Sequence, residues 1–394
     1  MSSERTDRQD GRARIKVVGC GGGGGNAVNR MISAALKGVE FIAVNTDLQA
    51  LERCNADIKV NIGRKLTRGL GSGGDWTKGR DAADESRAEL TELVKESDMV
   101  FITAGMGGGT GTGSSSVVAE VAKDQGALTI GVVTRPFRWE GKVRAETAEE
   151  GVNVLRDRVD ALIIIPNDRL TQVVDKRTTL EEAFKIADDV LRQGVQGIAD
   201  LIVNPGIINL DFADVKSIMS SAGEALMGIG FGSGENRAED AAKQAVSSPL
   251  LETSIDGAQG ILFNVTAGKD ITLFECEKAA EIIKASADPN ASIIFGVVND
   301  DRMQDEVKIT VVASGFGPTK RPQSAQQQQA AQAQQAQQAA QAQPGAAEEE
   351  PARYGEVRPR SSAPSPQPAP EPRPSYDVGE QDDLDVPAFL RNRF

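Results

Sequence analysis

A nine-residue run rich in glycine, Gly105–Gly113, limits what this chain can fold into more than any other feature. It follows the apolar run Met99–Ala104, which is typical of a buried parallel strand. The next residues, Ser114–Lys123, have the apolar spacing of a helix packed on that strand. Glycines between a strand and a helix let backbone N–H groups converge where the helix dipole favours an anion. The sequence therefore predicts a phosphate-binding loop with Thr110 and Thr112 as hydroxyl donors, and a merely flexible loop is the alternative.

Strand patterns alternate with helical patterns through the first half of the chain. A helix is expected to open near Asn26 after the glycine run Gly19–Gly25, and a charged helix is expected over Asp81–Ser97. Such alternation predicts a doubly wound α/β sheet with its ligand at the carboxyl ends of the strands. The expected strands besides Met99–Ala104 are Ile15–Val18, Val39–Val44, Ile58–Ile62, Leu128–Val133 and Ala161–Ile165.

A long helix is predicted over Thr179–Ile202, and the sequence Asn204-Pro-Gly206 is a stop signal for it. A second, smaller α/β segment follows, and its last two strands are expected to form a hairpin through Asn299–Asp305. The buried positions expected in the long helix are Leu180, Phe184, Ala187, Val190, Leu191 and Ile198. The later strands expected are Glu224–Gly230, Gly260–Ala267, Ser292–Val298 and Val307–Ala313, with helices near Ala238–Ser247 and Leu273–Ser286.

Composition excludes several classes of function. The chain has no histidine, which removes Ser-His-Asp and Cys-His catalysis and histidine-ligated metals. Its three cysteines, Cys20, Cys54 and Cys276, have no paired spacing, which favours a reducing compartment. A net charge of −13 argues against nucleic-acid binding. No apolar run approaches the roughly 20 residues of a membrane helix, and the charged N-terminus is no signal peptide. We therefore expect a cytoplasmic protein with no direct membrane insertion.

The composition changes sharply after Gly317. Most of the chain's 17 prolines lie beyond it, together with the Gln/Ala tract Gln323–Gln343. Such a segment cannot bury enough apolar area to offset its ordering entropy, so we expect a disordered linker over 318–381 and a disordered arm over 1–13. The end segment, Asp382–Phe394, again gathers apolar residues among charges. It is predicted to be a short peptide that binds a partner's groove, and an inert terminus is the alternative.

The first glycine run leaves two kinds of nucleotide open. Gly19-x-Gly21-x-x-Gly24 fits the dinucleotide fingerprint, and Asp47 lies near the expected acidic position. An NAD-dependent oxidoreductase is therefore one hypothesis, although a run of five glycines fits any glycine pattern. The Walker sequence is absent, which excludes an ordinary P-loop NTPase. A second anion loop at Gly105–Gly113 is more than a pyrophosphate needs, and the two loops together suit a nucleoside triphosphate.

Several motifs in order then carry a family resemblance. Gly107–Gly113 is similar to the tubulin signature. Together with four further motifs it makes the chain closely resemble the FtsZ family of bacterial division GTPases. The resemblance runs from about Ile15 to Gly317, and the end peptide also looks like the family's tail. The four motifs are Gly21–Asn26, Ala43–Asp47, Ile165–Arg169 and Asn209–Asp214.

The resemblance implies a tubulin/FtsZ-like fold: a Rossmann-like GTP-binding domain over 14–178, a connecting helix over 179–203, and a smaller α/β domain over 204–317 with the catalytic loop. GTP or GDP would be the ligand. Phe184 would stack on guanine, and Asp188, with Asp189 as second choice, would accept hydrogen bonds from its N1–H and 2-amino group. The alternative for the charged residues is that they are ordinary solvated helix charges. The nucleotide-binding residues implied are Gly22, Gly23, Gly24, Gly25, Asn26, Asn45, Gly73, Gly105, Gly108, Gly109, Thr110, Gly111, Glu140, Arg144, Phe184 and Asp188.

Catalysis in this family is completed between subunits. The resemblance implies that Asp211 and Asp214 reach the γ-phosphate of the next subunit's nucleotide and position the attacking water, while Asn209 helps orient it. Mg²⁺ would offset phosphate charge. Head-to-tail assembly into filaments of a division ring at mid-cell follows, with membrane-tethering and regulatory proteins bound at 382–394. Capping of the next helix is the alternative for one of the two aspartates.

One departure from the family lies in the third glycine loop. The family usually has Asn-Pro-Glu there, whereas this chain reads Gly74-Asp-Trp-Thr-Lys-Gly79. Trp76 and Lys78 put the details of phosphate sensing and subunit contact in doubt. A scaffold that binds GTP without hydrolysing it is therefore a further alternative.

Overall fold

The computed structural model describes residues 13–172, 175, 177–203, 208, 211–251 and 253–316. Nearly all of the expected N-terminal arm, the expected linker and the expected end peptide lie outside this part of the chain. Asn209, expected in the catalytic loop, also lies outside it.

Parallel strands form the first part of a ten-stranded sheet, whose order is β3-β2-β1-β4-β5-β6-β7-β10-β8-β9. All six expected strands of the first half are present and pair in parallel, which confirms the doubly wound α/β prediction. They are β1 (Ile15–Cys20), β2 (Val39–Asn45), β3 (Ile58–Asn61), β4 (Met99–Gly105), β5 (Leu128–Arg135) and β6 (Ala161–Pro166).

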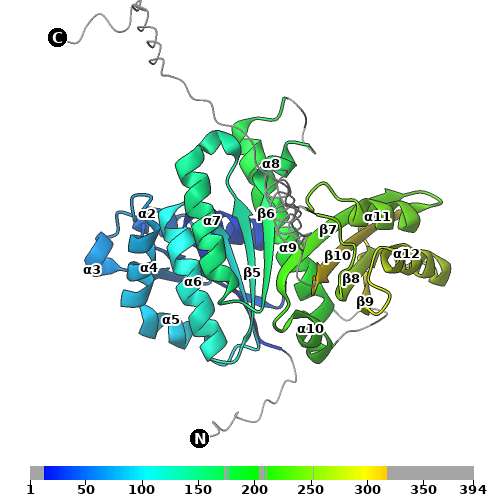
Figure 1. The fold of residues 1–394 in the computed structure, drawn as a ribbon, viewed down its shortest axis with the longest axis horizontal. Coiled ribbons are helices and arrows are strands. Elements are labelled where there is room, and N and C mark those ends of the chain that lie inside the picture. Colours follow the sequence, from blue (N-terminus) through cyan, green and yellow to red (C-terminus); the bar gives the residue numbers. More distant parts are fainter. Residues whose placement is uncertain are drawn as a thin grey trace, which may run out of the picture. The chain divides into compact units, whose positions relative to one another are not determined.

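Helices cover both faces of these strands (Figure 1). The first half contains α1 (Gly21–Ser33), α2 (Leu48–Glu52), α3 (Arg64–Thr67), α4 (Trp76–Glu85), α5 (Arg87–Val94), α6 (Gly109–Asp124), the 3₁₀ turn η1 (Arg138–Glu140), α7 (Lys142–Arg156), α8 (Asn167–Leu170) and the connecting helix α9 (Leu180–Val203).

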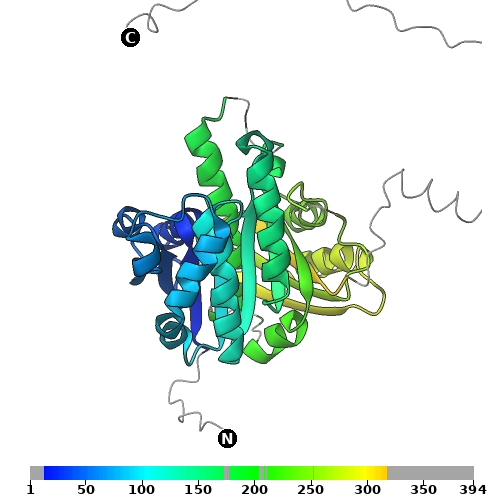
Figure 2. The same ribbon diagram turned by 60° about the vertical axis from the view of Figure 1, so that its left-hand side comes forward.

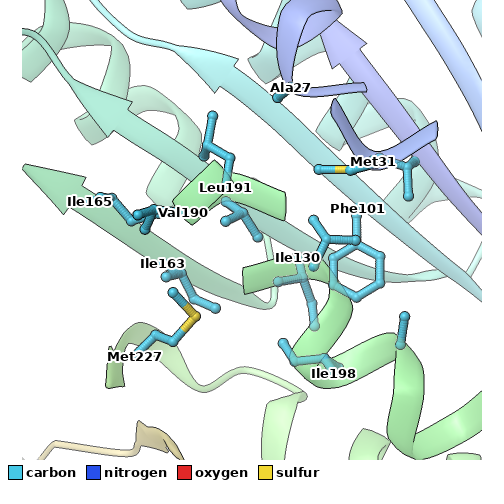
Figure 3. Close-up of a cluster of buried hydrophobic side chains, with 14 of the residues drawn as sticks. Ala27, Met31, Phe101, Ile130, Ile163, Ile165, Val190, Leu191, Ile198 and Met227 are labelled. Atoms are coloured by element: carbon cyan, nitrogen blue, oxygen red, sulfur yellow. The ribbon is translucent and has the colours of Figure 1, made fainter. Parts of the chain in front are cut away.

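The alternation of side chains along each strand sends neighbouring residues to opposite cores. Val17 of β1 packs in the core beneath α1 and α9, whereas Val18 packs in the core beneath α4 to α7. Figure 3 shows the first of these cores, which includes Met31 of α1, Leu191 of α9 and Phe101 of β4. Because both faces are covered, the strands are apolar through their length, which is why they could be recognised in the sequence.

Two helices start earlier than expected, and one predicted helix is divided. The chain turns helical at Gly21 and Gly109, not at Asn26 and Ser114, so the glycines form the first turns of α1 and α6. Glycine has a low helix propensity, so these turns were not predicted. Tertiary packing fixes their backbone and overrides that propensity. The charged helix is interrupted at Ser86, between α4 and α5.

The second half continues the same sheet through β7, whose start pairs in parallel with β6. The predicted hairpin of the last two strands is wrong: β10 lies between β7 and β8 and is antiparallel to both, while β9 pairs in parallel with β8. β10 is buried along most of its length and needs neighbours on both sides, whereas β9 is more exposed and forms the edge. The elements are α10 (Phe212–Met219), β7 (Gly223–Ser233), α11 (Arg237–Val246), β8 (Gly260–Ala267), α12 (Leu273–Ala285), β9 (Ser292–Asn299) and β10 (Glu306–Ser314).

The connecting helix α9 packs on the sheet through most of its predicted apolar positions, but Leu180 and Phe184 are exposed by 58% and 39%. Its first turns extend beyond the carboxyl edge of the strands, as Figure 2 shows, so the sheet cannot cover them. Among the described residues, no helix has the length and apolar character needed to cross a membrane.

Candidate nucleotide site

The carboxyl ends of β1 and β4 bring the first two glycine runs into contact. A Cβ atom on Gly21 would lie 2.6 Å from the backbone nitrogen of Gly111, and one on Gly23 would lie 3.2 Å from that of Gly105. A Cβ on Gly24 would lie 2.4 Å from the backbone oxygen of Thr103. The N-termini of α1 and α6 can therefore start side by side because these positions lack side chains. Two adjacent helix N-termini offer unpaired N–H groups to an anion.

Gly22 and Gly108 differ from their neighbours, because a Cβ on either would meet nothing within 4 Å. A Cβ on Gly25 would just reach Cys54 Sγ, at 4.0 Å. Packing inside the protein does not demand glycine at Gly22 or Gly108, and Gly108 has a φ of −88°, which other residues adopt readily. Glycine at these two positions is instead explained if a ligand approaches the backbone closely.

The third glycine loop joins the second through buried hydroxyl groups. Thr110 Oγ1 lies 2.6 Å from Thr46 Oγ1 and 3.2 Å from Ser72 Oγ. Thr112 Oγ1 accepts a hydrogen bond from the backbone N–H of Gly107. Both threonine hydroxyls thus have partners within the protein, so what the start of α6 offers a ligand is mainly its backbone N–H groups. Gly73, in the same third loop, has a φ of +67° and no neighbour within 4 Å.

The loop after β2 contains Asn45 and Asp47. Asn45 is buried; its backbone oxygen accepts from Asn61 Nδ2, and its Oδ1 accepts from the backbone N–H of Asp47. The carboxylate of Asp47 caps α2 by accepting from the N–H groups of Gln49 and Ala50. The dinucleotide hypothesis assigns this aspartate to a ribose hydroxyl. Helix capping explains its presence without such a ligand, which weakens that hypothesis.

Glu140 and Arg144 form an ion pair of 3.0 Å beside the second glycine loop. Glu140 Oε1 also accepts from the backbone N–H of Phe137, and its side chain is 8% exposed, whereas that of Arg144 is 51% exposed. A Cβ on Gly107 would lie 2.6 Å from the backbone oxygen of Arg144, so the start of α7 packs closely on this loop. The guanidinium therefore lies near the anion-binding turns and is open to solvent.

An aromatic cluster joins η1 to α9. The ring centroids of Phe137 and Trp139 lie 5.4 Å apart in a stacked arrangement, and Phe184 meets both rings edge-on at 5.8 and 6.1 Å. Phe184 and Trp139 both remain substantially exposed. This partly open apolar surface is suited to the face of a planar base.

Asp188 lines a cavity of about 330 Å³ together with Asn26, Arg30 and Phe184. Burial raises the pKa of its carboxyl to about 7, and the charge of Arg30 opposes that rise. The carboxylate of Asp188 makes no hydrogen bond to another described residue, whereas that of Asp189 accepts from Arg192 at 2.7 Å. The structure thus separates the two candidates for base recognition. Asp188 is the carboxylate with free hydrogen-bonding capacity facing the cavity.

Two residues near this site were not assigned a role from the sequence. Arg30 follows Asn26 by four residues on α1 and therefore lies on the same helix face, a spacing that could have pointed to it. Asn167 begins α8 at the carboxyl end of β6, and its buried Oδ1 has no hydrogen-bond partner in the described part of the chain. A buried amide oxygen without a partner is costly unless a ligand or water satisfies it.

Asp211 and Asp214 lie at the other edge of the sheet. They begin α10, which leads into β7 at Gly223, next to Ala161 at the amino end of β6. Figure 1 shows α10 at the end of the molecule opposite α8. Asp211 Oδ1 accepts from the backbone N–H of Asp214 at 2.8 Å, and Asp214 Oδ2 accepts from that of Asp211 at 3.4 Å. Both carboxylates are thus used in capping, and both side chains remain exposed to solvent.

Comparison with known proteins identifies the family. Residues 14–175 match the GTPase domain of the Tubulin/FtsZ family, and residues 223–317 match the C-terminal domain of the FtsZ family. The chain is also similar to a solved structure described as an empty FtsZ dimer from M. jannaschii, with 47% identity and a TM-score of 0.75 over 78% of this chain and 89% of that one. The chain belongs to the FtsZ family. The GTPase domain of an FtsZ-family protein binds and hydrolyses GTP, and the glycine turns described above lie within the matched region.

Two further structures place this FtsZ-family chain among its relatives. A tryptophan-to-tyrosine mutant of the M. jannaschii FtsZ has 47% identity and a TM-score of 0.75 over 77% of this chain and 92% of that one. CetZ2 from Haloferax volcanii, solved as a GTPγS-bound protofilament, has 20% identity and a TM-score of 0.66 over 82% of this chain and 99% of that one, a likeness of fold alone.

Proposed function

We propose that this GTPase assembles head-to-tail into filaments and that each active site is shared by two subunits. The observation that carries the proposal is the placement of the two groups of residues at opposite edges of one sheet. The anion-binding turns of α1 and α6 lie at the carboxyl edge, and Asp211 and Asp214 lie at the amino edge. A carboxylate at one edge cannot reach a phosphate bound at the other within the same subunit.

The nucleotide would bind across the carboxyl edge. Its phosphates would lie on the turns formed by Gly22–Asn26 and Gly105–Gly111, with Gly73 of the third loop beside the outer phosphate. Arg144, held by Glu140, would face the phosphate and ribose side. The base would stack on Phe184 and donate its N1–H and 2-amino hydrogens to Asp188, which adenine cannot do. The cavity that Asp188 shares with Phe184 supports a guanine nucleotide.

Hydrolysis would need the amino edge of a second subunit. Asp211 and Asp214, with Asn209 before them, would meet the outer phosphate and position the attacking water in a loose, metaphosphate-like transition state. The exposure of the two aspartates leaves them accessible to such a partner. A contact between different faces of identical subunits can propagate into a filament, because each subunit in a pair still has one of the two faces free to bind the next subunit. The M. jannaschii FtsZ structure described as a dimer supports self-association.

Mg²⁺ would arrive as part of the substrate, MgGTP. The described residues contain no group of three or more Asp, Glu, Cys or His side chains that could hold a metal. Mg²⁺ bound with a nucleotide is usually held chiefly by phosphate oxygens and water. The cellular role we propose is formation of the division ring at mid-cell in the bacterial cytoplasm, with tethering and regulatory proteins bound by 382–394.

The proposal is tested by measuring GTP turnover per subunit against protein concentration, for the wild type and for Asp211→Asn. Asparagine caps a helix about as well as aspartate, so this variant keeps the cap and removes the charge. We expect a concentration threshold followed by a plateau in the wild type. In the variant we expect at least about a hundred-fold slower turnover, the usual scale for losing a group that acts on a proton in the transition state, with unchanged GTP affinity. Turnover per subunit that is independent of concentration would contradict the proposal.

A further inference from the structure

The loop between α3 and α4, Gly69–Asp75, contains three glycines whose conformation packing does not fix. Gly71, Gly73 and Gly74 all have left-handed φ angles, between +67° and +85°, and a Cβ on any of them would meet nothing within 4 Å. Glycines in open space can adopt many conformations, and holding them in one is entropically costly. The position of this third glycine loop therefore depends on the anchors at its ends.

The anchors at the start and middle of the loop are hydrogen bonds to neighbouring loops. The backbone N–H of Leu48 donates to the oxygen of Gly69 at 3.1 Å, and Ser72 is bonded to Thr110 at the start of α6. At the other end, Asp75 caps α4 by accepting from the N–H groups of Thr77 and Lys78. The end of the loop is thus anchored by α4 and by close packing on α6, where a Cβ on Gly109 would lie 2.8 Å from the backbone oxygen of Asp75.

Trp76, the first residue of α4, connects this helix to α7. Its indole Nε1 donates to Glu150 Oε2 at 3.0 Å, and the guanidinium of Arg80 lies 5.8 Å from the centre of the ring. Helix α6 lies between the two helices, as Figure 1 shows. A Cβ on Gly113 of α6 would lie 2.2 Å from the backbone oxygen of Trp76, and one on Gly151, beside Glu150, would lie 2.1 Å from Thr112. The bridge therefore passes over the first turns of α6.

The fold of α4 against α6 does not depend on this bridge. A Cβ on Gly79 of α4 would lie 2.3 Å from the backbone oxygen of Gly109, so the two helices already pack backbone to backbone. The bridge connects the end of the third glycine loop to α7, whose first turn contains Arg144. The loop and α7 are thereby joined on either side of the first turns of α6.

We propose that Trp76 and Glu150 form a latch that holds the third glycine loop over the outer phosphates and slows the release of nucleotide. The inference rests on the proposed GTP site and adds two positioning residues to it. Release of the nucleotide requires the loop to move away, and that movement must break the bond between the indole and the carboxylate.

The test compares the release rate of a fluorescent GDP, chased by excess GDP, among four variants of the full-length protein. Trp76→Phe and Glu150→Ala each remove the hydrogen bond, worth about 1 kcal/mol, and should release the nucleotide about five-fold faster. Glu150→Gln keeps an acceptor oxygen for the indole and should release it at the wild-type rate. Glu146→Ala is the matched control, because Glu146 lies one turn away on α7 and forms an exposed ion pair with Lys142.

Thermal unfolding of each variant separates the latch from a purely structural role. Unchanged release from Trp76→Phe and Glu150→Ala would overturn the proposal, whatever happens to Tm. Release from Glu150→Gln as fast as from Glu150→Ala would also overturn it, because the hydrogen bond would then not matter. If the proposed nucleotide site were wrong, the wild type would fail to bind the fluorescent GDP, before any variant is compared.

Discussion

The two edges of the sheet differ in how they are built. At the carboxyl edge, turns from α1, α6 and the third glycine loop pack against one another, and Asp188 is half-buried, which raises its pKa. At the amino edge, Asp211 and Asp214 stand exposed at the start of one short helix and bond to each other's backbone. One edge packs helix N-termini and loops closely together, and the other presents accessible carboxylates.

This difference indicates which task each edge can perform alone. A preformed surface made of fixed N–H groups can bind an anion without help. Exposed carboxylates in water are poor at positioning a single water molecule, because their orientation and desolvation must come from a partner. Binding without assembly and hydrolysis only with assembly is therefore what the structure leads us to expect.

The largest effect should come from a charge placed at the carboxyl edge. Gly108→Asp introduces a carboxylate at the N-cap of α6, where the backbone angles accept it and no neighbour lies within 4 Å. Aspartate favours a helix N-cap, so the fold should be kept, while repulsion of the phosphates should weaken GTP binding by at least about a hundred-fold. Gly108→Asn is the uncharged control of the same size and should lose less affinity. Wild-type affinity in both variants, measured by calorimetry, would show that the α6 turn does not hold phosphate.

A smaller effect is expected from the titration of Asp188. Guanine needs the ionised carboxylate as acceptor, and with a pKa of about 7 the ionised fraction falls about ten-fold between pH 8 and pH 6. GTP affinity should fall by a similar factor over this range, and Asp188→Asn should bind weakly with no such dependence. A wild-type affinity that is flat between pH 6 and pH 8 would contradict the assignment of Asp188 to the base.

The same group links pH to the stability of the nucleotide-free protein. Because the folded-state pKa lies above the ordinary value of 3.8 for an aspartate, the folded protein binds the proton more tightly than the unfolded chain does. Stability should therefore fall as pH rises from about 4 through about 7, and Asp188→Asn should lose that part of the slope. Denaturant unfolding at several pH values measures the difference, and other titrating groups cancel when the two proteins are compared.

The smallest effect on GTP turnover and assembly should come from deleting the end peptide. Removing residues 384–394 should leave GTP turnover and assembly unchanged, because the proposed site needs only residues before 318. The same deletion should abolish capture of tethering or regulatory proteins in a pull-down. Turnover that falls with the deletion would mean that the end peptide contributes to the site itself.

Most of the fold could be predicted because the parallel strands are buried on both faces. Runs such as Met99–Ala104 are apolar throughout, and the glycines after them mark the carboxyl edge. The position of β10 could not be predicted. The short segment between β9 and β10 suggests that the two strands pair with each other, but both pair with β8, which is more distant in the sequence. The short connection favoured a hairpin, but the apolar strand β10 is buried between β7 and β8.

The site was predicted unevenly for a similar reason. The glycine turns have a local sequence pattern, whereas the choice between Asp188 and Asp189 needed the position of Arg192, which donates to Asp189. The bond between Trp76 and Glu150 joins residues 74 positions apart and has no pattern in the sequence. Contacts of this kind become visible when the helices are placed in space.

The most direct test of the central claim mixes two inactive proteins. Gly108→Asp should not bind GTP but keeps Asp211 and Asp214, whereas Asp211→Asn should bind GTP but lacks the charge at the amino edge. If one active site is built from the two edges of neighbouring subunits, the mixture should hydrolyse GTP at interfaces where the amino edge of Gly108→Asp meets the nucleotide of Asp211→Asn. Turnover well above the sum of the separate proteins would support the account, and turnover no higher than that sum would contradict it.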